Sequence, residues 1–191
     1  MKTFIVTEGE VTAVLMERLV RCHPVLRERS VVVRAGEYRT GVMFKTRTLL
    51  SVKHVPVAAV FNPETVHPTY LEERRGFAEG YIGEAGPPDD FLIFDVPPNV
   101  AVLLFQDEDV MRAFLPAPLS VEDRVRARYE PEVVLAEQIA QAGEGPFLEA
   151  LAQRLAQADL SVLWRLDALK PLEDFLLRVS EVQPTWSPEA P

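Results

Sequence analysis

The chain has 191 residues, 48% hydrophobic and 26% charged, a composition typical of one globular domain, or one domain with a helical extension, rather than a disordered tail. Its formal net charge of −9 has the wrong sign for a protein that wraps nucleic acid nonspecifically, so we expect any contact with nucleic acid to be weak. A single cysteine, no secretion signal and no long apolar run predict a cytoplasmic protein that does not enter a membrane.

Short apolar runs in the N-terminal half predict four β-strands, at residues 3–6, 30–34, 57–61 and 91–96. Helical spacing of apolar residues separates these runs, at residues 11–20, 40–52 and 70–82. Continuous apolar strands joined through helices indicate a parallel sheet covered on both faces, because crossovers of this length cannot form hairpins. The sequence therefore predicts an α/β fold with about four parallel strands flanked by helices.

The C-terminal half changes in character and is predicted to be mostly helical from about residue 120. Apolar residues recur there at helical spacing, in two stripes formed by Leu148, Leu151 and Leu155 and by Leu172, Phe175, Leu176 and Val179. Such stripes must be buried, either against the sheet or against a second copy of the chain. A homodimer through the C-terminal helices is therefore one expectation.

Acidic or amide side chains lie at or just past the ends of the predicted strands. They are Glu8, Glu37, Asn62, Glu64 and, near the end of the fourth strand, Asp95. In open parallel sheets, ligands bind beyond the carboxyl ends of the strands. If the first and third strands are neighbours, Glu8, Asn62 and Glu64 converge on an oxygen-rich spot that suits Mg²⁺ or Mn²⁺.

Two segments resemble the toprim domain, the fold shared by topoisomerases, primases and the overcoming-lysogenization-defect type nucleases. The segment FIVTEGEVTAVLMERLV at residues 4–20 is similar to the family's first strand, its Glu-Gly turn and the following helix. The segment VPVAAVFNPETVHPTYLEERR at residues 55–75 is similar to a later strand, followed in the family by an Asp-x-Asp pair, a Thr and a helix. The resemblance covers about residues 3–115 and implies metal-assisted breaking or joining of phosphodiester bonds.

Position by position, the resemblance assigns Glu8 to the family's general acid/base or metal-binding glutamate and Gly9 to the glycine that follows it. Asn62 and Glu64 stand where the family carries its two aspartates, and Thr12 stands where many relatives carry another acidic residue. The resemblance thus implies Glu8 and Glu64 as catalytic residues and Glu8, Asn62 and Glu64 as metal ligands, with Gly9 and Asp95 in support. The acidic motif is degenerate, because an asparagine supplies an oxygen but no charge.

The predicted function follows from this incomplete acidic set. One weakly bound Mg²⁺ or Mn²⁺ is conceivable, whereas two metal ions would need more carboxylates. We expect a toprim-like module with impaired catalysis that acts by binding a partner protein, such as a separate ATPase, since the chain has no P-loop. The alternative is a Mg²⁺- or Mn²⁺-dependent nuclease-like phosphodiesterase, and a third class is a small-ligand binding domain.

Plainer interpretations of the same residues stay open at this stage. Glu8 and Gly9 could form only a strand-to-helix turn with an acid near the helix N-terminus. Residues 62–65 could be a turn and a helix cap. For the domain organisation we expect a toprim-like domain at 1–118, a helical region at 119–182 and a flexible tail at 183–191.

Overall fold

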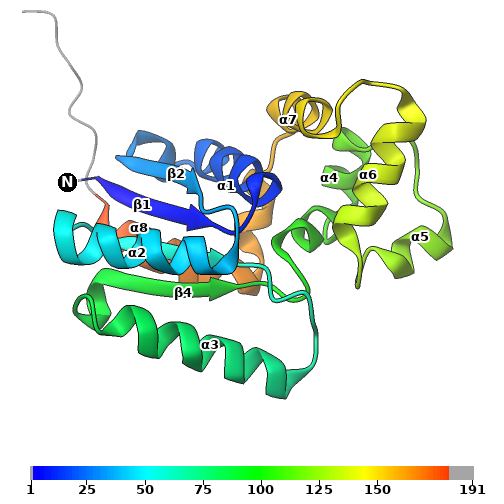
Figure 1. Cartoon of the computed structure of the whole chain (residues 1–191). Helices are drawn as coiled ribbons and strands as arrows, with labels where there is room; N and C mark the ends of the chain where they lie inside the picture. Colours follow the sequence, from blue (N-terminus) through cyan, green and yellow to red (C-terminus); the bar gives the residue numbers. More distant parts are fainter. Residues whose placement is uncertain (1, 181–191) are drawn as a thin grey trace, which may run out of the picture.

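The protein forms one four-stranded sheet in which all neighbouring strands are parallel (Figure 1). The computed structural model describes residues 2–180, so the predicted tail at 183–191 lies outside the described residues. The strand order is β2-β1-β3-β4, with β1 at Thr3–Thr7, β2 at Val31–Ala35, β3 at Val57–Phe61 and β4 at Phe91–Asp95. This arrangement confirms the predicted α/β fold, and it makes the first and third strands neighbours.

Eight α-helices of the described chain surround or extend this sheet. They are α1 (Glu10–Cys22), α2 (Arg39–Lys53), α3 (Pro68–Gly83), α4 (Glu108–Phe114), α5 (Val121–Arg126), α6 (Pro131–Ala142), α7 (Phe147–Gln157) and α8 (Lys170–Val179). Short 3-10 turns lie between them, among them η1 at Leu26–Glu28 and η3 at Val100–Phe105. Between residues 2 and 180, none of the helices has the length and hydropathy needed to cross a membrane.

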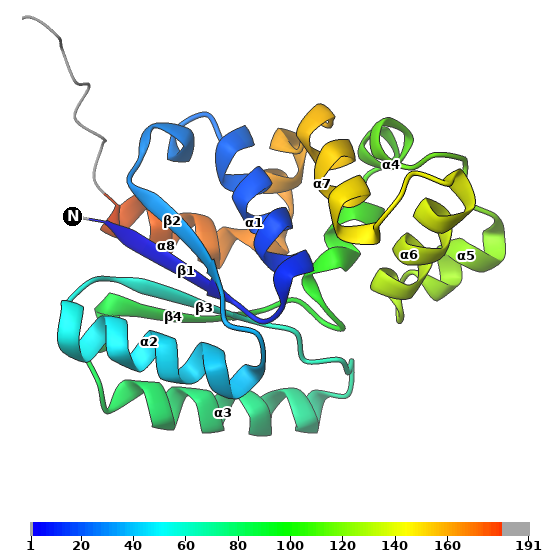
Figure 2. The same cartoon turned by 45° about the horizontal axis from the view of Figure 1, so that its top comes forward.

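The two faces of the sheet carry cores of different size. Helices α2 and α3 cover one face, where Val6, Val42 and Ile82 belong to a small cluster of buried side chains (Figure 2). Helices α1 and α8 lie on the other face, where a much larger cluster extends from Ile5 into the C-terminal region. All five residues of β3 are buried, which explains why this strand has no polar residue.

The apolar stripes of the C-terminal helices are buried within the chain itself. Leu151 and Leu155 of α7 and Phe175 and Leu176 of α8 are all at most 4% exposed and belong to the larger core. These four side chains are thus covered by the chain itself and not by a second copy of it. Leu148 and Val179 of the same stripes are only half-buried, and the homodimer through these helices stays a prediction.

A buried histidine anchors the C-terminal region to the sheet. His23, 3% exposed, follows α1 and accepts the backbone N–H groups of Val25 and Leu26 at its Nδ1, at 3.1 and 2.9 Å. Its Nε2 therefore carries the hydrogen in the neutral ring and donates it to Glu173 of α8 at 2.8 Å. Trp164 packs edge-on against the His23 ring. His23 thus has a structural role.

Helices α4, α5 and α6 form a helical lobe that lies beyond the carboxyl ends of the strands (Figure 1). The arrowheads of β1 and β4 point toward this lobe, and η3 connects β4 to it. The position of the lobe matters for function, because it faces the edge at which parallel sheets bind their ligands.

Candidate functional site

Glu8 lies at the turn from β1 into α1, as the sequence predicted. Its backbone N–H donates to Val60 O at 2.9 Å, which continues the pairing of β1 with β3 by one residue. Gly9 then adopts φ 80°, a left-handed conformation that glycine accepts at little cost. A Cβ at Gly9 would meet no atom within 4 Å, so the backbone angle, and not lack of space, favours glycine here.

Asn62 forms a crosslink between the ends of three segments. Its Nδ2 donates to Glu8 O at 3.2 Å and to Thr12 Oγ1 at 2.9 Å, and its Oδ1 accepts the Val100 N–H at 3.3 Å. Its backbone N–H donates to Glu8 Oε2 at 3.0 Å. The side chain thus uses both amide hydrogens and its oxygen inside the protein. Thr12 is 1% exposed and part of this crosslink.

An arginine that the sequence analysis did not select also binds Glu8. Arg39, in the first turn of α2, places its Nη2 3.7 Å from Glu8 Oε2, and the two side chains are 25% and 21% exposed. Its Nη2 also donates to Asn62 O at 3.4 Å, and its guanidinium lies over the Phe61 ring at 5.0 Å. The position of Arg39 shortly after β2 could have identified it in the sequence. A residue that follows a parallel strand reaches the same edge of the sheet as Glu8.

Glu64 departs from this cluster. It adopts φ 54°, and its backbone N–H donates to Pro98 O at 2.7 Å. Arg74 of α3 donates to Pro63 O and fixes the preceding residue. The negative charge of Glu64 acts on Glu132, in the first turn of α6, and opposes ionisation of that second carboxyl group.

Glu132 is a second residue that the sequence analysis missed. Burial raises the pKa of the Glu132 carboxyl above its ordinary value, and the negative charge of Glu64 raises it further. No local pattern could identify this residue, since it lies 68 positions after Glu64 in the chain, a separation that follows from their numbers alone. Only the packing of the lobe brings the two carboxyl groups together.

Asp95 closes β4 and forms an ion pair of its own. Arg75 Nη2 of α3 lies 2.6 Å from Asp95 Oδ1, and the Asp95 side chain is 11% exposed. The hydrogen bond with Asp95 raises the pKa of the Arg75 guanidinium, although burial opposes it. Asp95 and Glu8 thus each face an arginine.

Two of the three ligands expected for a divalent cation, Glu8 and Asn62, are already bound by other groups of the chain. Among residues 2–180, no group of three or more His, Cys, Asp and Glu side chains could hold a metal ion. The Asn62 oxygen accepts a backbone hydrogen, and the Glu8 carboxylate already faces a cation. These residues, in this arrangement, do not fit the metal centre that the resemblance implies.

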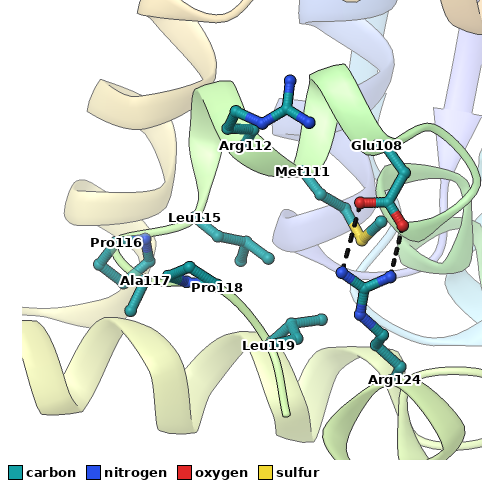
Figure 3. Close-up of a pocket in the computed structure, with 9 residues that line it drawn as sticks. All are labelled: Glu108, Met111, Arg112, Leu115, Pro116, Ala117, Pro118, Leu119 and Arg124. Atoms are coloured by element: carbon teal, nitrogen blue, oxygen red, sulfur yellow. Dashed lines mark hydrogen bonds and ion pairs between the residues drawn. The ribbon is translucent and has the colours of Figure 1, made fainter. Parts of the chain in front are cut away.

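The helical lobe has a pocket of about 270 Å³ of its own (Figure 3). Met111, Leu115 and Leu119 supply apolar walls, and the Glu108 carboxylate pairs with the Arg124 guanidinium at one side. None of the strand-end residues predicted from the sequence lines this pocket. It is a hollow between α4 and the segment that leads into α5, separate from the candidate site.

Comparisons with protein families, curated proteins and solved structures found no match to this chain. The assignment of a function therefore depends on the residues and the geometry described above.

Proposed function

We propose that the protein is a toprim-like module with impaired catalysis that acts by binding a partner protein. One observation carries the proposal: the Asn62 side chain, at a position where the family has a metal-binding aspartate, uses both its amide hydrogens and one lone pair of its oxygen in hydrogen bonds within the chain. An amide used in this way is a structural crosslink, because a metal ligand needs a free oxygen lone pair directed at the ion.

The ion pair of Glu8 supports the same proposal. A two-metal phosphoryl-transfer site needs several carboxylates to offset the repulsion between two cations about 4 Å apart. Here Arg39 supplies a permanent positive charge next to Glu8 and offsets the charge that would attract a divalent ion. Any Mg²⁺ or Mn²⁺ held by Glu8 and Glu64 would therefore bind weakly, and would first have to displace Arg39 from Glu8.

The charge of the chain favours a protein partner over nucleic acid. A net charge of −9 repels the phosphate backbone at long range, and nonspecific affinity for duplex DNA depends on its neutralisation by Lys and Arg. The chain has no P-loop and cannot bind ATP in that way, which leaves a separately encoded ATPase as one class of partner.

A nuclease assay with a matched variant tests this function. Purified wild-type protein and Glu8→Ala are incubated with plasmid, single-stranded DNA and RNA in Mn²⁺. We expect no cleavage above the level of the Glu8→Ala control, because the donor set for two metals is absent from the described residues. Robust cleavage by wild type that is lost in Glu8→Ala would show the alternative, a metal-dependent phosphodiesterase, and would overturn the proposal.

A further inference from the structure

Strand β2 forms an outer edge of the sheet, and its outward backbone groups follow from the register (Figures 1 and 2). Thr3 N–H donates to Ser30 O, and Gly36 N–H donates to Thr7 O, at 2.9 and 2.7 Å. In a parallel pair these bonds alternate along each strand, so residues 30, 32, 34 and 36 bond to β1. The N–H and C=O groups of Val31, Val33 and Ala35 consequently point away from the sheet.

Three of these outward groups bond within the chain. Val31 N–H donates to Arg29 O, Lys45 donates to Ala35 O, and the Arg34 side chain donates to Val33 O at 3.0 Å. The Val33 N–H points outward where no strand of residues 2–180 pairs with it. It is the central donor of an edge five residues long.

A groove of about 300 Å³ runs along this edge, between β2, α1 and η1. Its apolar part includes Val20, Leu26 and the valines of β2, and its charged part consists of four arginines and one glutamate: Arg21, Arg27, Arg29, Arg34 and Glu17. Arg21 pairs with Glu17 at 2.5 Å and Arg27 with the adjacent Glu28 at 3.2 Å, so four arginines face two glutamates here, in contrast with the net charge of −9 for the whole chain. This basic groove beside a free strand edge attracts an acidic partner.

The charges also select among the occupants that a free edge can accept. A second copy of the chain, paired through β2, would bring two sets of these arginines together, which like-charge repulsion opposes. The opposite edge, β4, also has a groove, but there one arginine, Arg75, faces two acids, Asp95 and Glu79, so this groove has no excess of positive charge. An extended acidic segment of another protein therefore fits the β2 groove better than a second copy of the chain does, and better than it fits the β4 groove.

We propose that the basic β2 groove binds an extended acidic segment of the partner protein, which adds to the sheet as a fifth strand beside β2. Backbone hydrogen bonds to Val33 supply the pairing, and carboxylates of the segment bind the arginines that line the groove. This inference deepens the proposed partner-binding function and rests on it, since it names the surface and the chemistry of the partner.

The test uses a fluorescein-labelled peptide of alternating glutamate and valine, about seven residues long, which covers a five-residue strand. We expect fluorescence anisotropy to show saturable binding that weakens with salt, and Arg34→Glu to weaken it by about tenfold or more. Arg112→Glu, in the helical lobe, makes the same change of charge and should leave binding unchanged. In ¹⁵N-labelled protein, the Val33 amide should become protected from hydrogen exchange when the peptide binds.

Two control peptides separate strand pairing from simple charge attraction. One has lysine in place of each glutamate, and the other keeps the acids but carries N-methyl groups on alternate backbone amides. We expect neither to bind, because the first has the wrong charge and the second cannot form a ladder of hydrogen bonds. Equal binding of the N-methylated peptide, or no binding of the acidic peptide at millimolar concentration, would overturn the inference. The nuclease assay is independent of this result, so loss of the β2 inference leaves impaired catalysis standing, and Glu8-dependent cleavage overturns the proposed function alone.

Discussion

The carboxyl end of the sheet and its β2 edge use their polar groups in opposite ways. At the carboxyl end, Asn62, Glu8 and Asp95 are all bound by groups of the chain itself. At the β2 edge, the Val33 N–H points outward and arginines line an open groove. Groups that are paired within the chain stabilise the fold, whereas an outward backbone donor such as the Val33 N–H is available to bind a partner.

This difference bears on where function resides in the molecule. The resemblance to toprim domains directs attention to the strand ends, and the structure does bring Glu8, Asn62 and Thr12 together there. Their hydrogen bonds, however, connect β1, β3 and η3 to each other, and the Asn62 oxygen accepts the Val100 N–H as part of this junction. The cluster at the strand ends is a structural junction in this chain, and the β2 edge becomes the better candidate for binding.

Asn62→Ala is expected to have the largest effect on stability, and it tests the difference between the two regions. The substitution removes three side-chain hydrogen bonds and leaves partly buried groups unpaired, so we expect the free energy of unfolding to fall by about 2–4 kcal/mol. Chemical denaturation with urea measures the change. Arg34→Ala, at the exposed end of β2, is the matched variant and should stay within about 0.5 kcal/mol of wild type. Similar losses in both variants would remove the distinction between the two regions.

A smaller effect is expected when charge is restored at the strand ends. Asn62→Asp loses the same donors as Asn62→Ala but places a carboxylate beside Glu8, so it should regain stability when Mn²⁺ is added. For a dissociation constant of about 1 mM, Mn²⁺ at about 10 mM would add about 1.4 kcal/mol. Thermal melts across a Mn²⁺ series measure the gain, and Asn62→Ala should show none. Identical responses of the two variants would show that no metal site can be recovered at this position.

The smallest effect concerns the contact of the lobe with the strand ends. Because the folded-state pKa of Glu132 is raised by burial and by Glu64, the folded protein holds a proton there more tightly than the unfolded chain does. The corresponding stability is fully present below the ordinary glutamate pKa of about 4.3 and is lost as the pH rises through the folded-state pKa. Glu132→Gln has no carboxyl group to ionise, so its free energy of unfolding should be higher than that of wild type near neutral pH. We expect a difference of less than about 1 kcal/mol, since solvent screens the two groups.

Unfolding midpoints at pH 4 and pH 7 check this expectation. The unfolding midpoint of Glu132→Gln minus that of wild type should increase from pH 4 to pH 7. The same difference for Glu64→Gln should show part of this increase. A Glu132→Gln difference that stays constant with pH would mean that the pKa of Glu132 is not raised, and a constant Glu64→Gln difference would mean that the two carboxyl groups do not interact.

The sequence by itself determined the architecture of the sheet region. Apolar runs at the four strands, helical spacing between them and a glycine after Glu8 are local patterns, and they predicted a parallel α/β sheet with Glu8 and Asn62 at one edge. Such patterns succeed because the period of side chains along a strand or helix is fixed by backbone geometry. The toprim resemblance and the predicted cytoplasmic location stay predictions.

Only the tertiary structure decided which groups at that edge are paired. Arg39 and Arg75 reach Glu8 and Asp95 from other parts of the chain, and no local spacing encodes those partners. Packing also decided that the stripe containing Phe175 is buried within the chain and that β2 has a free edge. The physical reason is that periodicity shows which face of an element must be covered, whereas the partner that covers it, and the charge that it brings, depend on how the whole chain folds.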